Sequence, residues 1–470
     1  MSIKVAFVNP WKQGNEFLSS AAPPYNLMYL ASYIKKNFDN FEIKIIDGIV
    51  GDNICMSLKA FNPDYVCITS TTPIINIAYE LADWARKELD CIVIMGGVHV
   101  SVMPQEAIKH CDYVVVGEGE IALVNLIKYM PELGGVIEAD FIMNLDEIPQ
   151  LDFSMIDIEH YINAKDNSAR TIPYCKKDAR AITIVTSRGC NAKCIFCHNS
   201  FRGTPTRYNS AQRVFDIIKD LVNNYKINAI WFGDDEFLIN RPRLYMIINA
   251  MKENNIHIEW GCQARADTIL RYGIEYLKML KESGCNLIAI GCESGNDRVL
   301  KFLKDNQSSI QNNSDAIKLC NQAGIKVAGS FMVGVPGETK EEMMDTFNFI
   351  MNHDIIGSIG IATPYPGTTL WKIALSKGFP IDKIDYSRYL NNLRPEDSII
   401  ICDTMSKEDF IKLYNMISQK IGEKIMYNKV LKEDVPVSKI FWHSFKKKPW
   451  FVISFPIRHP IKTLKMVARR

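Results

Sequence analysis

Three cysteines in one short loop are the residues whose type and spacing most directly suggest chemistry. Cys190, Cys194 and Cys197 stand in the sequence RGCNAKCIFCHNS, after the apolar run AITIV at 181–185. Thiolates are soft ligands, and a group of three or four binds zinc or an iron–sulfur cluster. A structural zinc site takes four ligands, usually from two CxxC pairs, and His198 adjoins Cys197 too closely to reach the same ion. Zinc therefore fits this loop poorly.

Two other interpretations use the same cysteines. The stretch at 194–198 matches the CxxCH motif of covalent c-type haem, whose attachment we expect only outside the cytoplasm. The CxxxCxxC spacing, with Phe196 directly before the last cysteine, resembles the radical SAM superfamily. This resemblance implies that the three cysteines are the metal ligands and catalytic centre, holding three irons of a 4Fe-4S cluster. It also implies that the open iron binds S-adenosylmethionine, which an electron from the cluster splits to a 5'-deoxyadenosyl radical.

Polar residues and glycines follow the later predicted strands, at the end of a barrel where active-site residues gather. Taken singly, they are explained equally well as helix caps, turns or surface charges. The resemblance implies instead that the loop at 233–236 holds the methionyl amine, that Arg265 binds the methionyl carboxylate and that Glu293 reaches the cosubstrate. The full set that it assigns to S-adenosylmethionine is Phe196, Gly233, Asp234, Asp235, Glu236, Arg265, Glu293 and Ser294.

The composition is that of a globular protein with more than one domain. The chain has 470 residues, of which 47% are hydrophobic and 23% charged. A net charge of +2 argues against nucleic-acid binding through bulk charge. We find no apolar stretch of signal-peptide or membrane-span length and expect a cytoplasmic protein, whose 13 cysteines do not form a disulfide framework. Four cysteines lack metal-ligand spacing and are expected to be buried, although the first could also line the site: Cys262, Cys285, Cys292 and Cys320.

The first part of the chain alternates β-rich runs with helical patterns. Strands are predicted at 3–9, 41–47, 64–70, 90–95 and 112–116. Because each is apolar enough to be buried on both faces, they indicate a doubly wound, Rossmann-like α/β domain at 1–135, which would bind ligands at the carboxyl ends of its strands. Residues 136–178 show no clear periodicity and are predicted to be a linker that packs between domains.

The same alternation resumes after the linker. Strands are predicted near 181–186, 228–232, 256–261, 286–291, 325–333 and 355–362. Six βα units predict a partial (β/α)6 TIM-like barrel at 179–375, open on one side because eight units would close it. A mainly helical region is predicted at 376–470, where Ser406 and Asp409 resemble a capping box. The helix that follows has an apolar stripe formed by Phe410, Leu413, Ile417, Ile421 and Ile425.

The first domain resembles the cobalamin-binding domain that precedes the barrel in one radical SAM subfamily. The resemblance depends on GGVH at 96–99, GEGE at 117–120 and PPYNL at 23–27. It implies a cobalamin site formed by Pro10, Trp11, Thr69, Ser70, Thr71, Gly96, Gly97, Val98, His99, Gly117, Glu118, Gly119 and Glu120. The loop at 9–14 lacks the histidine that many cobalamin domains place beneath cobalt, so we expect cobalamin without a histidine ligand. A nicotinamide site is disfavoured because no GxGxxG follows the first strand.

Together these features predict a cobalamin-dependent radical SAM methyltransferase that acts on an unactivated carbon, with an electron donor such as a flavodoxin or ferredoxin. The basic, aromatic run KKKPWF at 446–451 is either a solvated terminus or a membrane-surface contact, and the second would favour a lipid or isoprenoid substrate. Two alternatives stay open. One is radical cyclisation, coupling or oxidation without methyl transfer, and the other is a non-catalytic iron–sulfur or cobalamin sensor docked to a membrane.

Overall fold

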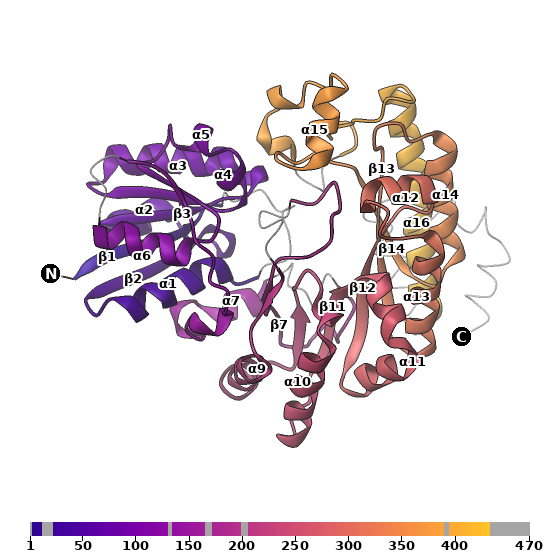
Figure 1. The fold of residues 1–470 in the computed structure, drawn as a ribbon, viewed down its shortest axis with the longest axis horizontal. Helices are drawn as coiled ribbons and strands as arrows, with labels where there is room; N and C mark the ends of the chain where they lie inside the picture. Colours follow the sequence, from indigo (N-terminus) through magenta and orange to yellow (C-terminus); the bar gives the residue numbers. More distant parts are fainter. Residues whose placement is uncertain are drawn as a thin grey trace.

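Two parallel sheets of six strands organise the chain (Figure 1). The computed structural model describes residues 2–11, 22–129, 134–164, 172–198, 205–389 and 394–432. The predicted fold class, a Rossmann-like domain followed by a partial barrel, is confirmed. The predicted basic, aromatic tail begins beyond 432 and lies outside the described residues.

The first sheet has the strand order β2-β1-β3-β4-β5-β6. Its strands are β1 Ile3–Asn9, β2 Phe41–Asp47, β3 Tyr65–Thr69, β4 Ile92–Gly96, β5 Tyr113–Val116 and β6 Gly135–Glu138. Its helices are α1 Tyr25–Asn37, α2 Ile54–Phe61, α3 Ile75–Glu88, α4 Val98–Val102, α5 Pro104–Ala107 and α6 Gly119–Tyr129. Helices α1 and α6 pack on one face of the sheet, and α2 and α3 pack on the other. The chain is therefore doubly wound, which places every β-to-α loop at the carboxyl edge of the sheet.

Strand β6 extends the first sheet past the predicted domain end at 135, because it pairs in parallel with β5. The rest of the predicted linker carries the short elements η3 Leu145–Glu147, η4 Phe153–Met155 and α7 Ile158–Asn163. Tyr161 of α7 donates a hydrogen bond of 2.7 Å to Asp47 of the first sheet, whereas Ile158 and Ile162 pack into the core of the barrel. Helix α7 thus contacts both domains.

The second sheet has the order β7-β10-β11-β12-β13-β14, and all its neighbouring strands are parallel. The strands are β7 Ala181–Ile184, β10 Ala229–Phe232, β11 Glu259–Ala264, β12 Cys285–Glu293, β13 Lys326–Val333 and β14 Ile356–Ile361. The helices that follow them are α9 Ala211–Tyr225, α10 Arg241–Glu253, α11 Ala266–Glu282, α12 Asp297–Lys304, α13 Ile310–Gln322, α14 Lys340–Asn352 and α15 Thr369–Ser376. The six predicted barrel strands are confirmed.

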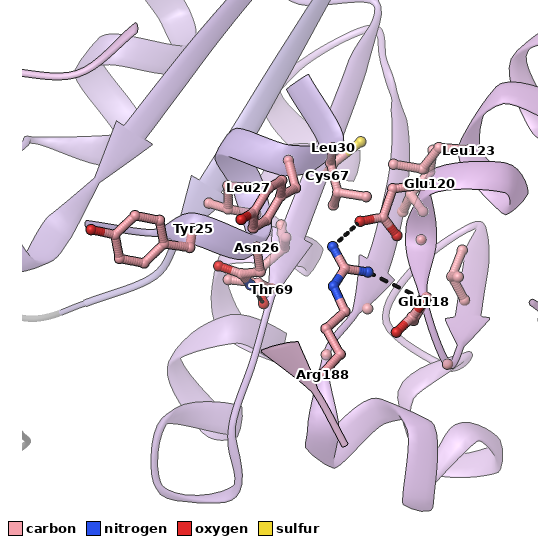
Figure 2. Close-up of a pocket in the computed structure, with 18 of the residues that line it drawn as sticks. Tyr25, Asn26, Leu27, Leu30, Cys67, Thr69, Glu118, Glu120, Leu123 and Arg188 are labelled. Atoms are coloured by element: carbon pink, nitrogen blue, oxygen red, sulfur yellow. Dashed lines mark hydrogen bonds and ion pairs between the residues drawn. The ribbon is translucent and has the colours of Figure 1, made fainter. Parts of the chain in front are cut away.

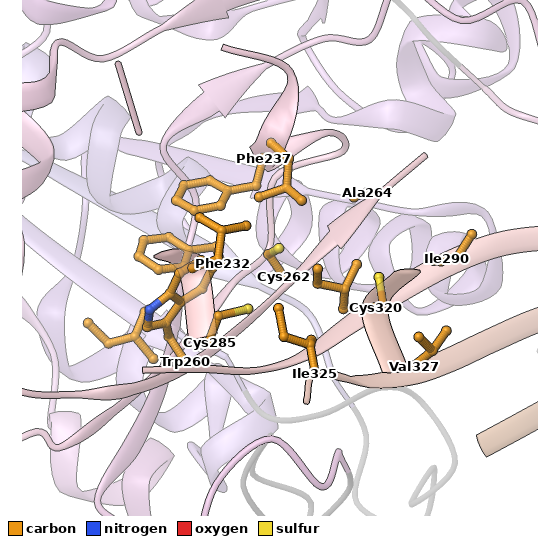
Figure 3. Close-up of a cluster of buried hydrophobic side chains, with 14 of the residues drawn as sticks. Phe232, Phe237, Trp260, Cys262, Ala264, Cys285, Ile290, Cys320, Ile325 and Val327 are labelled. Carbon is orange, nitrogen blue, oxygen red and sulfur yellow. The ribbon is translucent and has the colours of Figure 1, made fainter. Parts of the chain in front are cut away.

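The barrel core is apolar and encloses several thiols (Figure 3). Phe232 stacks on Phe237 and lies edge-on to Trp260, beside Cys262, which has no accessible surface. Burial raises the pKa of Cys262 well above its usual value. Cys262 therefore lies in the core, as first expected, and does not line the site, which corrects the second of its two predicted roles. The other three thiols singled out by the sequence are fully buried, as expected: Cys285, Cys292 and Cys320.

The predicted capping box opens the last described helix, α16 Lys407–Lys432. The Ser406 hydroxyl accepts a hydrogen bond of 3.1 Å from the backbone N–H of Asp409. The predicted stripe packs on the barrel between α14 and β14, with buried side chains at Phe410, Leu413, Ile417 and Ile421. Helix α16 therefore covers the last strands of the open barrel.

Candidate functional site

The cysteine loop begins at a two-stranded hairpin between the two domains. Its strands are β8 Ser187–Arg188 and β9 Arg207–Tyr208. The backbone of Ile195, in the middle of the loop, is held on both sides: its N–H donates to Leu303 of α12 and its C=O accepts from Leu370 of α15, both at 2.9 Å. The Ile195 and Phe196 side chains pack against the apolar clusters around these helices. Phe196, which the resemblance assigns to the S-adenosylmethionine site, thus also packs against these apolar clusters.

None of the three thiols of the loop forms a disulfide. Although Cys197 keeps accessible surface, the protein around it reduces its hydration and raises its pKa to about 12. Negative charge on Asp235, Cys194, Cys190 and Glu293 raises that pKa further, in this order, so these groups lie around Cys197. Metal binding would remove the thiol protons, because a coordinating thiol is deprotonated.

No three His, Cys, Asp or Glu side chains converge as ligands of one metal ion within the described part of the chain. A 4Fe-4S cube requires a wider arrangement, because its thiolates bind different irons. Three reduced thiols in one loop are the kind of ligand set that such a cluster takes.

The acidic loop after β10 divides into two parts. Asp234 is buried, and its carboxylate accepts hydrogen bonds from the Thr186 backbone at 3.1 Å and from the hydroxyls of Thr186 and Ser187. Burial raises the pKa of Asp234, and these donors and Arg243 offset part of the rise. Asp234 therefore fixes the start of the hairpin, whereas Asp235 is exposed and faces the cysteines. Of this pair, Asp235 is the one whose carboxylate is open to a ligand.

Glu236 and Arg265 come from neighbouring strands and lie together. Glu236 is 3% exposed and accepts a hydrogen bond of 3.2 Å from the Arg265 backbone. Burial raises the pKa of Glu236 to about 7. The Arg265 guanidinium donates to Asp267 at 2.9 Å and lies 4.0 Å from Glu236. The structure thus brings the acidic loop and the predicted carboxylate-binding arginine together at the carboxyl ends of β10 and β11.

Glu293 ends β12, and the buried Lys304 lies 3.2 Å from its carboxylate. Ser294 is fully buried, and its hydroxyl is 3.1 Å from that of Thr346 on α14. Ser294 therefore connects the loop after β12 to α14, whereas Glu293 is near enough to Cys197 to affect its pKa.

A cavity of about 360 Å³ opens at the carboxyl edge of the first sheet (Figure 2). Seven of the residues predicted to bind cobalamin line it: Thr69, Gly96, Gly97, Gly117, Glu118, Gly119 and Glu120. Gly97 has φ +101°, and a Cβ there would lie 2.5 Å from the Ser70 carbonyl oxygen, so only glycine fits this turn. The rest of the wall is mostly apolar side chains of α1, α6 and β3 to β5, together with Asn26, Val185 and Arg188.

The other predicted cobalamin residues lie outside this cavity wall: Pro10, Trp11, Ser70, Thr71, Val98 and His99. His99 is fully buried, with Nδ1 3.1 Å from the Thr72 hydroxyl and its ring edge-on to Tyr386. Its pKa is lowered to about 4, by burial first and by His198 second, which shows that the cysteine loop approaches this helix.

Two arginines that the sequence analysis missed connect the cavity to the cysteine loop. Arg188, two positions before Cys190, lies 2.6 Å from Glu120 and 3.2 Å from Glu118. Arg207, on the facing strand, lies 2.7 Å from Glu118. Burial alone would lower the pKa of Arg188, but Glu120 and Glu118 more than offset this and the pKa is raised. The GEGE loop, predicted to bind cobalamin, therefore also holds both strands of the hairpin that begins the cysteine loop.

Within the described residues, no helix combines the length and the apolar character needed to cross a membrane.

Two segments of the chain match known families. Residues 184–350 match the radical SAM superfamily, and residues 18–127 match the B12 binding domain. The first segment contains the cysteine loop and the barrel strands β10 to β13, and the second contains nearly all of the cavity wall.

Similar proteins extend over most of the chain. An uncharacterized methyltransferase of Pyrococcus horikoshii is 33% identical over 386 residues, which cover 76% of this chain and 80% of that protein. Bacteriochlorophyllide d C-12(1)-methyltransferase of Chlorobaculum tepidum is 27% identical, with 82% of each chain covered. An anaerobic magnesium-protoporphyrin IX monomethyl ester cyclase of Cereibacter sphaeroides is 24% identical, with 82% of this chain and 66% of that protein covered.

The solved structure of the cobalamin-dependent S-adenosylmethionine radical enzyme OxsB, with aqua-cobalamin and S-adenosylmethionine bound, has the same fold. The TM-score is 0.64 at 19% identity, and the match covers 88% of this chain and 61% of that chain.

Proposed function

Because the chain belongs to the radical SAM family whose members carry an N-terminal B12-binding domain, we propose that it transfers a methyl group to an unactivated carbon of a small molecule. The family implies a 4Fe-4S cluster, S-adenosylmethionine and cobalamin as cofactors. The methyltransferase of Pyrococcus horikoshii, at 33% identity, supports methyl transfer over other radical reactions.

We assign the cluster to Cys190, Cys194 and Cys197, and S-adenosylmethionine to the loops that contain Asp235, Glu236, Arg265 and Glu293. When bound, the cluster supplies the electron that splits the cosubstrate, and the cobalamin carries the methyl group. Charge-assisted hydrogen bonds from these side chains would orient the amino and carboxylate groups of the cosubstrate at the cysteine loop. Cobalamin would occupy the cavity lined by Thr69, Gly97 and the GEGE loop.

The observation that carries the proposal is the bridge between Arg188 and the GEGE loop. Arg188 lines the cavity and stands two positions before the first cysteine. One side chain therefore touches the wall of the cobalamin site and the start of the cluster loop. This proximity supports a reaction in which a methyl group and a substrate radical must meet.

The substrate class and the partners are part of the proposal. The basic, aromatic run at 446–451 supports contact with an anionic membrane surface, and hence a lipid or isoprenoid substrate. A low-potential electron donor such as a flavodoxin or ferredoxin would reduce the cluster.

A second candidate is radical cyclisation without methyl transfer, which the similarity to the magnesium-protoporphyrin cyclase favours. The two candidates differ in the fate of the methyl group. We would incubate the reconstituted, reduced full-length protein anaerobically with S-adenosylmethionine labelled in its methyl group. Methyl transfer predicts both 5'-deoxyadenosine and label recovered with the corrinoid. Deoxyadenosine without labelled corrinoid would favour cyclisation. Neither product, with Cys194→Ala behaving like the wild type, would favour the non-catalytic sensor.

A further inference from the structure

Lys304, the last residue of α12, carries a positive charge into the protein interior. It is 6% exposed, although lysine is almost never buried unless it is paired. Its ammonium donates a hydrogen bond of 2.8 Å to the Gly291 carbonyl oxygen and lies 3.2 Å from Oε1 of Glu293. Both partners belong to the end of β12, so one buried charge fixes the terminus of this strand.

Glu293 needs such support because its backbone is unusual. Its φ is +61°, in the left-handed region that non-glycine residues seldom adopt, and the pairing of β12 with β13 shifts register between Gly291 and Glu293. In this conformation the carboxylate folds back over Gly291, where an added Cβ would lie 2.4 Å from Oε1. Gly291 provides the space for the carboxylate, and Lys304 provides the opposite charge.

The end of α12 also holds the cysteine loop. Leu303, next to Lys304, accepts the hydrogen bond from Ile195 at 2.9 Å. The Gln307 side chain accepts from the Lys193 backbone, and the Gln307 carbonyl accepts from the Arg265 guanidinium, both at 3.4 Å. The segment 303–307 therefore contacts the cysteine loop, Arg265 after β11 and Glu293 at the end of β12.

We propose that Lys304 is a positioning residue for S-adenosylmethionine: it holds the Glu293 carboxylate, at the end of the segment that anchors the cysteine loop, in the orientation that accepts hydrogen bonds from the cosubstrate. This inference rests on the proposed function. A carboxylate held by a buried ammonium has one orientation, which suits the ammonium and hydroxyl donors of S-adenosylmethionine. Without Lys304, the Glu293 carboxylate would lose this orientation, because an unpaired buried charge is costly.

The test measures the dissociation constant of S-adenosylmethionine for anaerobically reconstituted full-length protein by equilibrium dialysis. Lys304→Met should weaken binding about tenfold, the size of one lost hydrogen bond to a charged group. Lys304→Arg should restore most of the affinity, because it keeps the charge. Lys278→Met is the matched control: Lys278 lies on α11 with a side chain 52% exposed that pairs with Glu275, and its loss should leave the affinity unchanged.

A double-mutant cycle separates positioning from a general structural role. If Lys304 acts through Glu293, then Lys304→Met added to Glu293→Gln should cause little further loss. The double variant leaves no buried charge unpaired and carries the test if Lys304→Met alone does not fold. In the double variant, the iron content and the unfolding midpoint should stay near those of the wild type.

Two results would overturn the inference: wild-type affinity in Lys304→Met, or a full additional loss in the Glu293→Gln background. Both leave the proposed function standing if the wild type still forms 5'-deoxyadenosine. A wild type that neither binds S-adenosylmethionine nor forms 5'-deoxyadenosine would overturn the proposed function itself, together with the role of Lys304.

Discussion

The guanidinium of Arg188 lies 2.6 Å from the carboxylate of Glu120, although one residue belongs to the hairpin before the cysteine loop and the other to the first domain. The Glu120 side chain is 4% exposed and that of Arg188 19%. Removing one member of a buried pair leaves an uncompensated charge, which costs far more than the loss of a surface pair.

Arg188→Met should therefore lower the apparent free energy of unfolding in urea by about 3 kcal/mol. Arg188→Met combined with Glu120→Gln should cost clearly less than the sum of the two single changes, because no charge is left alone. Lys318→Met, which removes an exposed pair with Asp315, serves as control and should cost less than about 1 kcal/mol. Equal effects of Arg188→Met and Lys318→Met would show that the bridge adds nothing to stability.

The sequence predicted the strands of both sheets well, because most are buried apolar runs followed by helical patterns. Strand β6 was missed because Gly135–Glu138 is a short edge strand whose residues all keep accessible surface, so its sequence lacks the signal of a buried strand. The cysteine spacing and the resemblance singled out the loop at 190–197 and seven of the residues that line the cavity.

The sequence could not predict the bridge, because Arg188 and Glu120 are 68 positions apart and follow no shared periodicity. Which group a carboxylate binds depends on the packing of the domains, so GEGE was interpreted only as a cobalamin loop. Lys304 was missed for a similar reason: it ends an ordinary amphipathic helix, and only the fold shows that it turns inward.

A second contact between the domains involves Gly367, in the loop after β14. Its φ is +83°, and an added Cβ would lie 2.1 Å from Cγ1 of Val102 on α4. Gly378 has nearly the same φ, +81°, with nothing within 4 Å of the added atom. Both alanine variants should lose stability through backbone strain of about 1 kcal/mol.

Gly367→Ala should lose about 1 kcal/mol more than Gly378→Ala in urea denaturation, because overpacking adds to the strain. Adding Val102→Ala to Gly367→Ala should recover part of this difference. Identical losses for the two glycine variants would argue that the loop after β14 does not touch the first domain in solution.

The cavity can be filled without disturbing the cysteine loop. Asn26 of α1 lines it with an exposed side chain that donates a hydrogen bond of 2.8 Å to Thr69. Asn26→Trp should lower the affinity for hydroxocobalamin at least about tenfold by occupying the site, a loss of about 1.4 kcal/mol, and should leave the iron content unchanged. Met56→Trp, at a residue 69% exposed on α2, is the control and should bind as the wild type does. Unchanged corrinoid affinity in Asn26→Trp would place cobalamin elsewhere.

Glu338, after β13, predicts a pH dependence of stability. It is fully buried and accepts from the Val335 backbone at 3.2 Å, and burial raises its pKa from 4.5 to about 7. The unfolded chain therefore releases this proton at lower pH than the folded chain, so stability falls as the pH rises from about 4.5 to about 7. Glu338→Gln should remove up to about 3 kcal/mol of this fall, measured as the difference between the two unfolding free energies across the pH range. Parallel pH profiles for wild type and variant would contradict the prediction.

The most direct test of the account is the iron, sulfide and corrinoid content of anaerobically purified and reconstituted full-length protein. We predict about four irons, about four sulfides and about one corrinoid per chain. Cys194→Ala should lose the iron and sulfide while it keeps the corrinoid, because the two cofactors occupy different domains. Wild-type protein without iron, or iron and sulfide that stay unchanged in Cys194→Ala, would contradict the assignment of the cysteine loop and the radical chemistry with it.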